Sequence, residues 1–259
     1  MSVLECHDVS IRFGGVQALD RVNLEVGDEG EIVGILGPNG AGKTTLFNCI
    51  SGFARPDSGS ISLFGEDVTD LTPDARARRG LGRTFQQIGL VRSFTVLENL
   101  VVAQHASIEY RDTAGVLGAP GAQREERLLR QRAEVVLDVM ELLHLQDQPI
   151  QGLPYGTLKM VEVAAVLATD PRILMLDEPL AGTSTEEGVV FCDRLQRLRR
   201  ELGLTIVMID HHVPLVLGVA DYVYVLNFGR LLAHGSPETV RHDRSVAEAY
   251  MGEGAAALA

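Results

Sequence analysis

The sequence predicts an α/β protein with a mainly parallel sheet, an antiparallel β region and an inserted helical subdomain. Apolar and polar residues alternate in the manner of strands over residues 1–35. After residue 155, apolar strand-like runs alternate with helical patterns, which is typical of a parallel sheet with helices on both faces. The intervening segment, from about residue 87 to 155, is mainly helical in pattern.

The N-terminal part contains the predicted antiparallel strands and the first buried strand. The runs "VSIRF" and "VNLEV" alternate as exposed strands do, whereas "EIVGIL" at 31–36 is continuously apolar. A glycine-rich turn and the helical segment "KTTLFNCISGF" follow it, which together make a strand–loop–helix unit. The chain then returns to a strand at 59–68, and a short helix is expected within 72–80.

The predicted helical subdomain contains two helical patterns separated by a loop. Residues 95–105 form the first pattern, and a segment rich in Gly, Ala and Pro occupies about 107–122. In the second pattern, at 124–145, helical spacing places one apolar stripe on a single face: Leu129, Ala133, Val136, Met140 and Leu143. We interpret this stripe as the core of the subdomain.

The C-terminal part supplies the remaining predicted elements of the parallel sheet. A helix starts near residue 155, and the buried strand "ILML" follows it. We then expect a helix at 185–202, the strand "TIVMI", a short helix, and two final strands at 221–227 and 230–235. No internal repeat is evident.

Composition excludes several classes of protein. The 259 residues carry a net charge of −12 and are 46% hydrophobic, so a surface that coats nucleic acid is not expected. The three cysteines are widely spaced and indicate buried thiols in a reducing compartment. The sequence shows neither a secretory signal nor a bilayer-spanning run, so we expect a cytosolic protein or one on the cytosolic side of a membrane.

The glycine-rich turn carries a specific phosphate-binding motif. The segment "GPNGAGKT" fits the pattern G-x-x-x-x-G-K-[ST], in which backbone N–H groups point at phosphate oxygens. The ammonium of Lys43 would contact the β- and γ-phosphates, and the hydroxyl of Thr44 would bind Mg²⁺. The predicted nucleotide site comprises Gly37, Pro38, Asn39, Gly40, Ala41, Gly42, Lys43, Thr44 and Thr45.

Two carboxylates end the buried strand at 173–177. In "ILMLDEP", Asp177 is placed to reach the Mg²⁺ shell, and Glu178 could act as a general base toward water. Adjacent residues of a strand face opposite ways, but both side chains could reach one site where the pleat relaxes at the strand end.

With these motifs, the chain resembles the ABC-transporter ATPases nearly from end to end. The resemblance implies one ABC ATPase domain over residues 1–259, with a P-loop NTPase core that binds ATP and Mg²⁺. We expect the nucleotide-binding core at 1–86 and 156–259, and the helical subdomain at 87–155 with a loop insertion near 107–122.

The same resemblance implies roles for three more residues. Phe13 stands where the family places an aromatic ring against adenine, Gln86 in "RTFQQ" matches the Q-loop glutamine, and His211 in "IDHH" matches the switch histidine. The catalytic set is then Glu178, His211 and Gln86, and the metal set is Thr44, Gln86 and Asp177. A metal site at His211 and His212 is not expected, since no third ligand is evident.

A second phosphate site is implied by "LPYGT", which occupies the place of the family signature LSGGQ. In the family this segment binds the γ-phosphate held by the opposing subunit, so the partner is a second ATPase subunit, the same chain or a related one. The residues concerned are Leu153, Pro154, Tyr155, Gly156 and Thr157. Pro154 and Thr157 depart from the signature, Thr183 departs from the expected D-loop, and His212 stands where Asp is common.

Several stretches are similar to the ATPase subunits of branched-chain amino acid importers, among them "FGGVQAL", "RTFQQIGL", "TVLENLVVAQH" and "AEAYMGE". The loop insertion suits the longer of the two such subunits. The implied partners are transmembrane permease subunits and, indirectly, an extracytoplasmic solute-binding protein, with the chain on the cytoplasmic side of the inner membrane. Two alternatives stay open: a lipopolysaccharide-export-type ATPase, and a soluble ABC ATPase outside transport.

Overall fold

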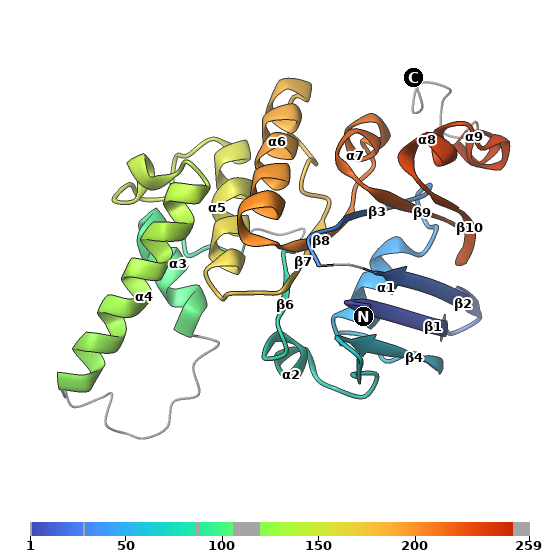
Figure 1. Cartoon of the computed structure of the whole chain (residues 1–259), viewed down its shortest axis with the longest axis horizontal. Coiled ribbons are helices and arrows are strands. Elements are labelled where there is room, and N and C mark those ends of the chain that lie inside the picture. Colours follow the sequence, from blue (N-terminus) through green and yellow to red (C-terminus); the bar gives the residue numbers. More distant parts are fainter. Residues whose placement is uncertain (1, 28, 86–88, 106–119, 251–259) are drawn as a thin grey trace. The chain divides into compact units, whose positions relative to one another are not determined.

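The computed structural model describes residues 2–27, 29–85, 89–105 and 120–250, and its chain divides into two compact units (Figure 1). The first unit comprises residues 1–86 and 172–259, and the second comprises residues 87–171. The second unit is longer than the subdomain expected at 87–155. The helix α5 (Tyr155–Leu167) belongs to it, because α5 packs on the other helices of that unit.

The centre of the first unit is a six-stranded sheet in the order β10-β9-β3-β8-β7-β6. All neighbouring strands in it are parallel except the hairpin of β9 and β10. This order confirms the predicted α/β class with a mainly parallel sheet. The bounds are β3 (Ile32–Leu36), β6 (Leu81–Arg83), β7 (Ile173–Asp177), β8 (Thr205–Ile209), β9 (Tyr222–Asn227) and β10 (Arg230–Gly235).

Both faces of this sheet are covered, which explains why its central strands are continuously apolar. Figure 1 shows α1 (Lys43–Ile50) on one side of the sheet and α6 (Thr185–Leu202) and α7 (Val213–Val219) on the other. The side chains of Val33 and Ile35 belong to the core that includes α1. Gly34 faces α7 so closely that an added Cβ would lie 2.5 Å from Val216 Cγ1. Two short helices, α8 (Pro237–Arg241) and α9 (Arg244–Tyr250), follow the sheet.

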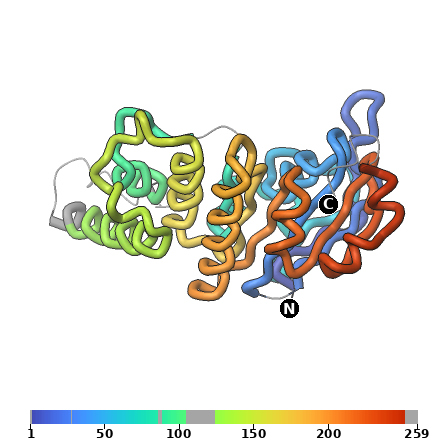
Figure 2. The backbone as a smooth tube through the Cα atoms, turned by 90° about the horizontal axis from the view of Figure 1, so that it is seen from above, coloured from blue at the N-terminus to red at the C-terminus, as the bar shows by residue number. Residues whose placement is uncertain are grey.

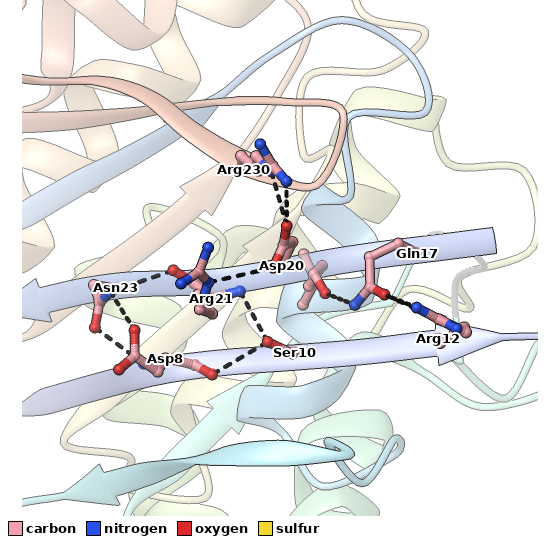
Figure 3. A network of polar contacts seen from close by, with 9 residues as sticks. Asp8, Ser10, Arg12, Gln17, Asp20, Arg21, Asn23 and Arg230 are labelled. Atoms are coloured by element: carbon pink, nitrogen blue, oxygen red, sulfur yellow. Dashed lines mark hydrogen bonds and ion pairs between the residues drawn. The ribbon is translucent and has the colours of Figure 1, made fainter.

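The predicted antiparallel region is a separate four-stranded sheet in the order β2-β1-β4-β5. Its strands are β1 (Leu4–Phe13), β2 (Val16–Val26), β4 (Ser58–Leu63) and β5 (Glu66–Asp67), and α2 (Pro73–Ala77) follows them. A network of polar contacts crosses β1 and β2 (Figure 3). In it, Arg230 of β10 donates two hydrogen bonds to Asp20 of β2, so the network also joins the two sheets.

The second unit is helical, as predicted. It contains α3 (Val96–His105), α4 (Pro120–Val139), a 3₁₀ turn (Leu143–Leu145) and α5, and α3 packs against both α4 and α5 (Figure 2). Leu129, Ala133 and Met140 of the predicted stripe are buried, whereas Val136 is only half-buried and the neighbouring Leu137 is buried instead. Of the loop predicted near 107–122, residues 107–119 lie outside the described residues.

None of the helices in the described part of the chain is both long enough and apolar enough to cross a membrane.

Candidate functional site

The phosphate loop and the two acidic residues lie at the same edge of the six-stranded sheet. The strands β3, β8 and β7 are parallel neighbours, and Ile35, Ile209 and Asp177 stand in register across them. The phosphate loop follows β3, His211 follows β8, and Glu178 follows β7. The carboxyl ends of the strands in an open α/β sheet form its ligand-binding edge, so the topology gathers residues that are far apart in the sequence.

The loop from Gly37 to Gly42 adopts a backbone that requires glycine. Gly42 precedes the first helical residue of α1 and has a φ of +103°, and an added Cβ would lie 2.7 Å from the carbonyl oxygen of Ala18. Gly40 also has a positive φ, of +76°. Gly42, the N-cap of α1, has no side chain to cap the helix, and a helix N-terminus of this kind suits an anion.

Lys43 lies over this loop with only 8% of its surface exposed. Its ammonium donates hydrogen bonds to the carbonyl oxygens of Gly37 (2.6 Å) and Pro38 (3.0 Å). Thr44 is exposed and Thr45 half-exposed at the start of α1, and Asn39 is exposed on the loop. The ammonium that would contact a phosphate therefore already lies against the loop that would surround the phosphate.

Asp177 ends β7 as a buried carboxylate with 2% exposure. Its Oδ2 accepts a hydrogen bond from the guanidinium of Arg83 at 2.8 Å, and its backbone N–H donates to Thr84 Oγ1 at 3.3 Å. Its Oδ1 is buried and accepts no hydrogen bond from the residues that the structure describes. A buried oxygen without a partner is costly in an ordinary protein core, so this atom is the one suited to a ligand.

Glu178 has a φ of +49°, in the left-handed region that non-glycine residues rarely occupy. Its backbone N–H donates to the Ile209 carbonyl oxygen (2.9 Å), which holds the turn in place beside β8. The chain turns here instead of continuing the pleat, so strand alternation does not force the two carboxylates to opposite faces. Backbone strain of this kind costs on the order of 1–3 kcal/mol and is concentrated at functional sites.

Two histidines and a buried acid follow β8. Asp210 is fully buried, and its Oδ1 lies 3.1 Å from His212 Nδ1 and 3.7 Å from His211 Nδ1. Its other oxygen accepts from the backbone N–H of Leu180 (2.9 Å). No third ligand beside the histidines was evident from the sequence, but Asp210 lies there, with both of its oxygens already hydrogen-bonded. The His211 side chain is half-exposed, as a residue that contacts a ligand must be.

The predicted adenine contact, Phe13, lies at the end of a strand. Phe13 is the last residue of β1, with 55% of its surface exposed, and Arg12 beside it donates two hydrogen bonds to Gln17 of β2 (Figure 3). A large exposed ring on a rigid hairpin is available for stacking. Gln86, predicted as a catalytic and metal-binding residue, lies outside the described residues.

The predicted second phosphate surface begins α5 in the helical unit. Pro154 is the N-cap of this helix and makes no side-chain cap to its first N–H groups, which begin at Tyr155. Pro154 and Tyr155 are exposed, and Leu153, Gly156 and Thr157 are half-buried. The missing N–H of Pro154 removes no hydrogen bond, because proline is tolerated where a helix starts.

Ser184, which follows the unusual D-loop residue Thr183, is the N-cap of α6. Its hydroxyl accepts from the Glu187 backbone N–H (3.2 Å), while its own N–H donates to the Glu187 carboxylate (2.9 Å), which makes a capping box at the start of α6. Thr183 donates its hydroxyl to the Leu180 carbonyl oxygen (2.7 Å).

Arg83 and Asp210 are site residues that the sequence reasoning missed. Each lies in a quoted segment, Arg83 at the start of "RTFQQ" and Asp210 in "IDHH". Position alone therefore could have indicated them, but Arg83 bonds to Asp177 on another strand, and Asp210 accepts from the distant Leu180 N–H as well as contacting the neighbouring histidines.

Comparison with known proteins agrees with this geometry. Residues 19–181 match the family described as ABC transporter, and residues 230–256 match the family described as branched-chain amino acid ATP-binding cassette transporter. Two relatives are 40% identical over 251 residues, covering 97% of this chain and 98% of theirs. They are the high-affinity branched-chain amino acid transport ATP-binding proteins BraF of Pseudomonas aeruginosa and LivG of Escherichia coli.

More distant relatives and solved structures share the whole fold. The lipopolysaccharide export system ATP-binding protein LptB of Escherichia coli is 35% identical over 253 residues, 98% of each chain. The ADP conformation of MJ1267, an ATP-binding cassette of an ABC transporter, superposes with a TM-score of 0.86 at 31% identity, covering 97% of this chain and 99% of that one. The chain belongs to the ABC transporter family, as an ATP-binding subunit with ATPase activity.

Proposed function

We propose that this chain hydrolyses ATP to power the import of branched-chain or related amino acids, on the cytoplasmic side of the cell membrane. The observation that carries the proposal is the match of residues 230–256 to the branched-chain amino acid family, together with the 40% identity to BraF and LivG over nearly the whole chain. In this role it works beneath permease subunits, and a solute-binding protein outside the membrane supplies the cargo.

The residues at the sheet edge fit a Mg²⁺ ion. The Oδ1 of Asp177, which has no partner among the described residues, and the hydroxyl of the exposed Thr44 are hard oxygen ligands of the kind that Mg²⁺ prefers. These two residues, with Gln86, would hold the ion, which when bound neutralises charge on the phosphates.

The same edge supplies the groups for hydrolysis. Lys43 and the N–H groups of α1 bind the phosphates, and Phe13 stacks on the adenine. Glu178, held at the turn after β7, accepts a proton from the attacking water, while His211 and Gln86 position the water and the γ-phosphate. Electrostatic stabilisation and positioning account for most of the acceleration in phosphoryl transfer.

The second phosphate surface completes the site of another subunit. We place residues 153–157 against the γ-phosphate held by an opposing ATPase subunit, so that two ATP molecules close a head-to-tail dimer. A dimeric post-hydrolysis state of the cassette MJ0796 with ADP and Pi, similar to this chain with a TM-score of 0.73 at 26% identity, supports this arrangement. Closure would then move the permease through contacts near Gln86 and the helical unit.

Gel filtration of Glu178→Gln tests this mechanism. The variant removes the proposed base and keeps the phosphate site, so it should bind MgATP, fail to hydrolyse it, and elute as a dimer only when MgATP is present. Wild-type protein with MgATP and the variant with ATP and EDTA are the controls, and both should elute as monomers. A variant that stays monomeric in MgATP, both alone and mixed with its partner ATPase subunit, would contradict the proposed dimer.

Uptake of labelled leucine tests the cargo. In an Escherichia coli strain without LivG, the chain should restore leucine uptake, and Glu178→Gln should not. The 35% identity to LptB keeps lipopolysaccharide export as the second candidate. Growth restored in a strain depleted of LptB, with leucine uptake left unrestored, would replace the import proposal with export.

A further inference from the structure

Arg83 is a buried cation at the candidate site, and the recognised motifs assign it no role. It ends β6 and pairs in parallel register with Met175 of β7, two residues before Asp177. Only 6% of its side chain is exposed. A buried guanidinium loses its hydration, so its position has to be maintained by specific partners.

Its partners come from two different elements. One terminal nitrogen donates to Asp177 Oδ2 at 2.8 Å, and the other donates to Asn48 Oδ1 at 2.9 Å and to the Ser51 hydroxyl. Asn48 belongs to α1, the helix that starts at the phosphate loop, and Ser51 directly follows it. The side chain therefore joins the end of the phosphate-loop helix to the strand that carries the acid.

Three aromatic rings surround the same guanidinium. The centroids of Phe47, Phe53 and Phe85 lie 5.6, 5.7 and 5.3 Å from its central carbon. Contacts of this kind suit the planar, weakly hydrated guanidinium better than an ammonium. The rings thus confine the guanidinium at the position from which it donates to Asp177.

The consequence for Asp177 is a defined orientation. The second side-chain torsion of an aspartate is broad and nearly two-fold, so backbone geometry alone leaves the carboxylate free to rotate. The hydrogen bond from Arg83 takes up Oδ2 and leaves Oδ1 buried without a partner in the described residues.

We infer that Arg83 is a positioning residue for the metal ligand Asp177, which it holds so that Oδ1 faces the Mg²⁺ that accompanies ATP. This inference rests on the proposed function, because it presupposes that Asp177 binds Mg²⁺. Arg83 touches neither nucleotide nor metal; it acts through the carboxylate.

Titration of nucleotide binding with Mg²⁺ tests the inference without relying on turnover. A fluorescent ATP analogue is bound first in EDTA and then at increasing Mg²⁺. Arg83→Met should bind the analogue within about twofold of wild type in EDTA, and should need at least about tenfold more Mg²⁺ for the metal-dependent increase in affinity. Arg83→Lys keeps the charge, but its single ammonium cannot contact Asp177 Oδ2 and Asn48 at the same time as the planar guanidinium does. Its Mg²⁺ requirement should therefore fall between those of wild type and Arg83→Met.

The direction in which Mg²⁺ affinity changes in Arg83→Met distinguishes a positioning role from a purely electrostatic effect of the lost charge. Removing a positive charge near a cation site would by itself strengthen Mg²⁺ binding, so tighter or unchanged Mg²⁺ dependence in folded Arg83→Met would overturn the inference. Arg172→Met is the matched control, because Arg172 also pairs with a carboxylate, Glu29 (2.7 Å), and stacks on the ring of Phe64, but is exposed. It should leave the Mg²⁺ titration unchanged.

Asp177→Asn separates the positioning role of Arg83 from the metal-binding role of Asp177. If Asp177→Asn loses its Mg²⁺ dependence and Arg83→Met keeps it, only the role of Arg83 is wrong. If Asp177→Asn itself titrates like wild type, the metal role in the proposed function fails, and the inference fails with it. Circular dichroism of each variant confirms that the comparison is made on folded protein.

Discussion

Arg76 is a buried structural cation whose removal should strongly lower stability. It lies on α2 with 1% exposure, and within the described part of the chain its hydrogen bonds go to backbone oxygens and to no carboxylate. Instead it donates to four backbone carbonyl oxygens, those of Cys49 and Ile50 at the end of α1 (both 2.6 Å), of Thr69 (2.9 Å) and of Leu71 (3.1 Å). The bonds to Cys49 and Ile50 satisfy carbonyl groups that the end of a helix leaves unpaired, and the other two hold the segment before α2.

The size of the effect of Arg76→Met follows from these bonds. The methionine keeps much of the apolar stem but donates nothing, so the carbonyl oxygen of Ile50 stays buried, and those of Thr69 and Leu71 stay partly buried, without the guanidinium. The Cys49 oxygen also accepts from the Gly52 N–H (3.2 Å), so the loss falls mainly on the other three. An unsatisfied buried acceptor costs about 1–3 kcal/mol, and relief from burying the charge offsets part of it, so we expect a loss of about 3–5 kcal/mol.

The free energy of unfolding, measured by urea titration with circular dichroism, checks this value. Arg78→Met on the same segment is the control, because Arg78 is half-exposed and pairs only with the exposed Asp74 (2.9 Å). An exposed pair of this kind contributes less than about 1 kcal/mol, so this variant should unfold close to wild type. A loss below about 1 kcal/mol in Arg76→Met would refute the view that this guanidinium caps the phosphate-loop helix.

Two further predictions concern the phosphate site and the buried thiols. Lys43→Ala should lower nucleotide affinity at least about tenfold, because charge-assisted bonds to phosphate are strong; unchanged binding of a fluorescent nucleotide would remove Lys43 from the site. Burial raises the pKa of Cys49 and of Cys192 to about 11, so both thiols should react with Ellman's reagent much more slowly in native protein than in urea. The unfolded thiols ionise near their ordinary pKa of 9.0, while the folded thiols stay neutral up to about pH 11. The free energy of unfolding should therefore fall as the pH rises above about 9, and the urea midpoint should be lower at pH 10 than at pH 8.

The sequence by itself determined the order of the elements and the phosphate loop. Continuous apolar runs predict the central strands, because both faces of a parallel sheet are covered by helices. The glycine pattern at 37–42 predicts a loop that only glycine can form, and Gly42 does have a φ of +103°. These signals are local, so they can be read from consecutive residues.

Only the tertiary structure decided how the site is held together. Arg83 and Asp177 are 94 residues apart in the chain, and no periodicity indicates that parallel register between β6 and β7 brings them together. The left-handed turn at Glu178 and the placement of α5 with α3 and α4 likewise follow from packing. Local patterns specify which residues can form a strand or a loop, but the partner of a buried charge is chosen by contacts between distant segments, which form only when the chain is folded.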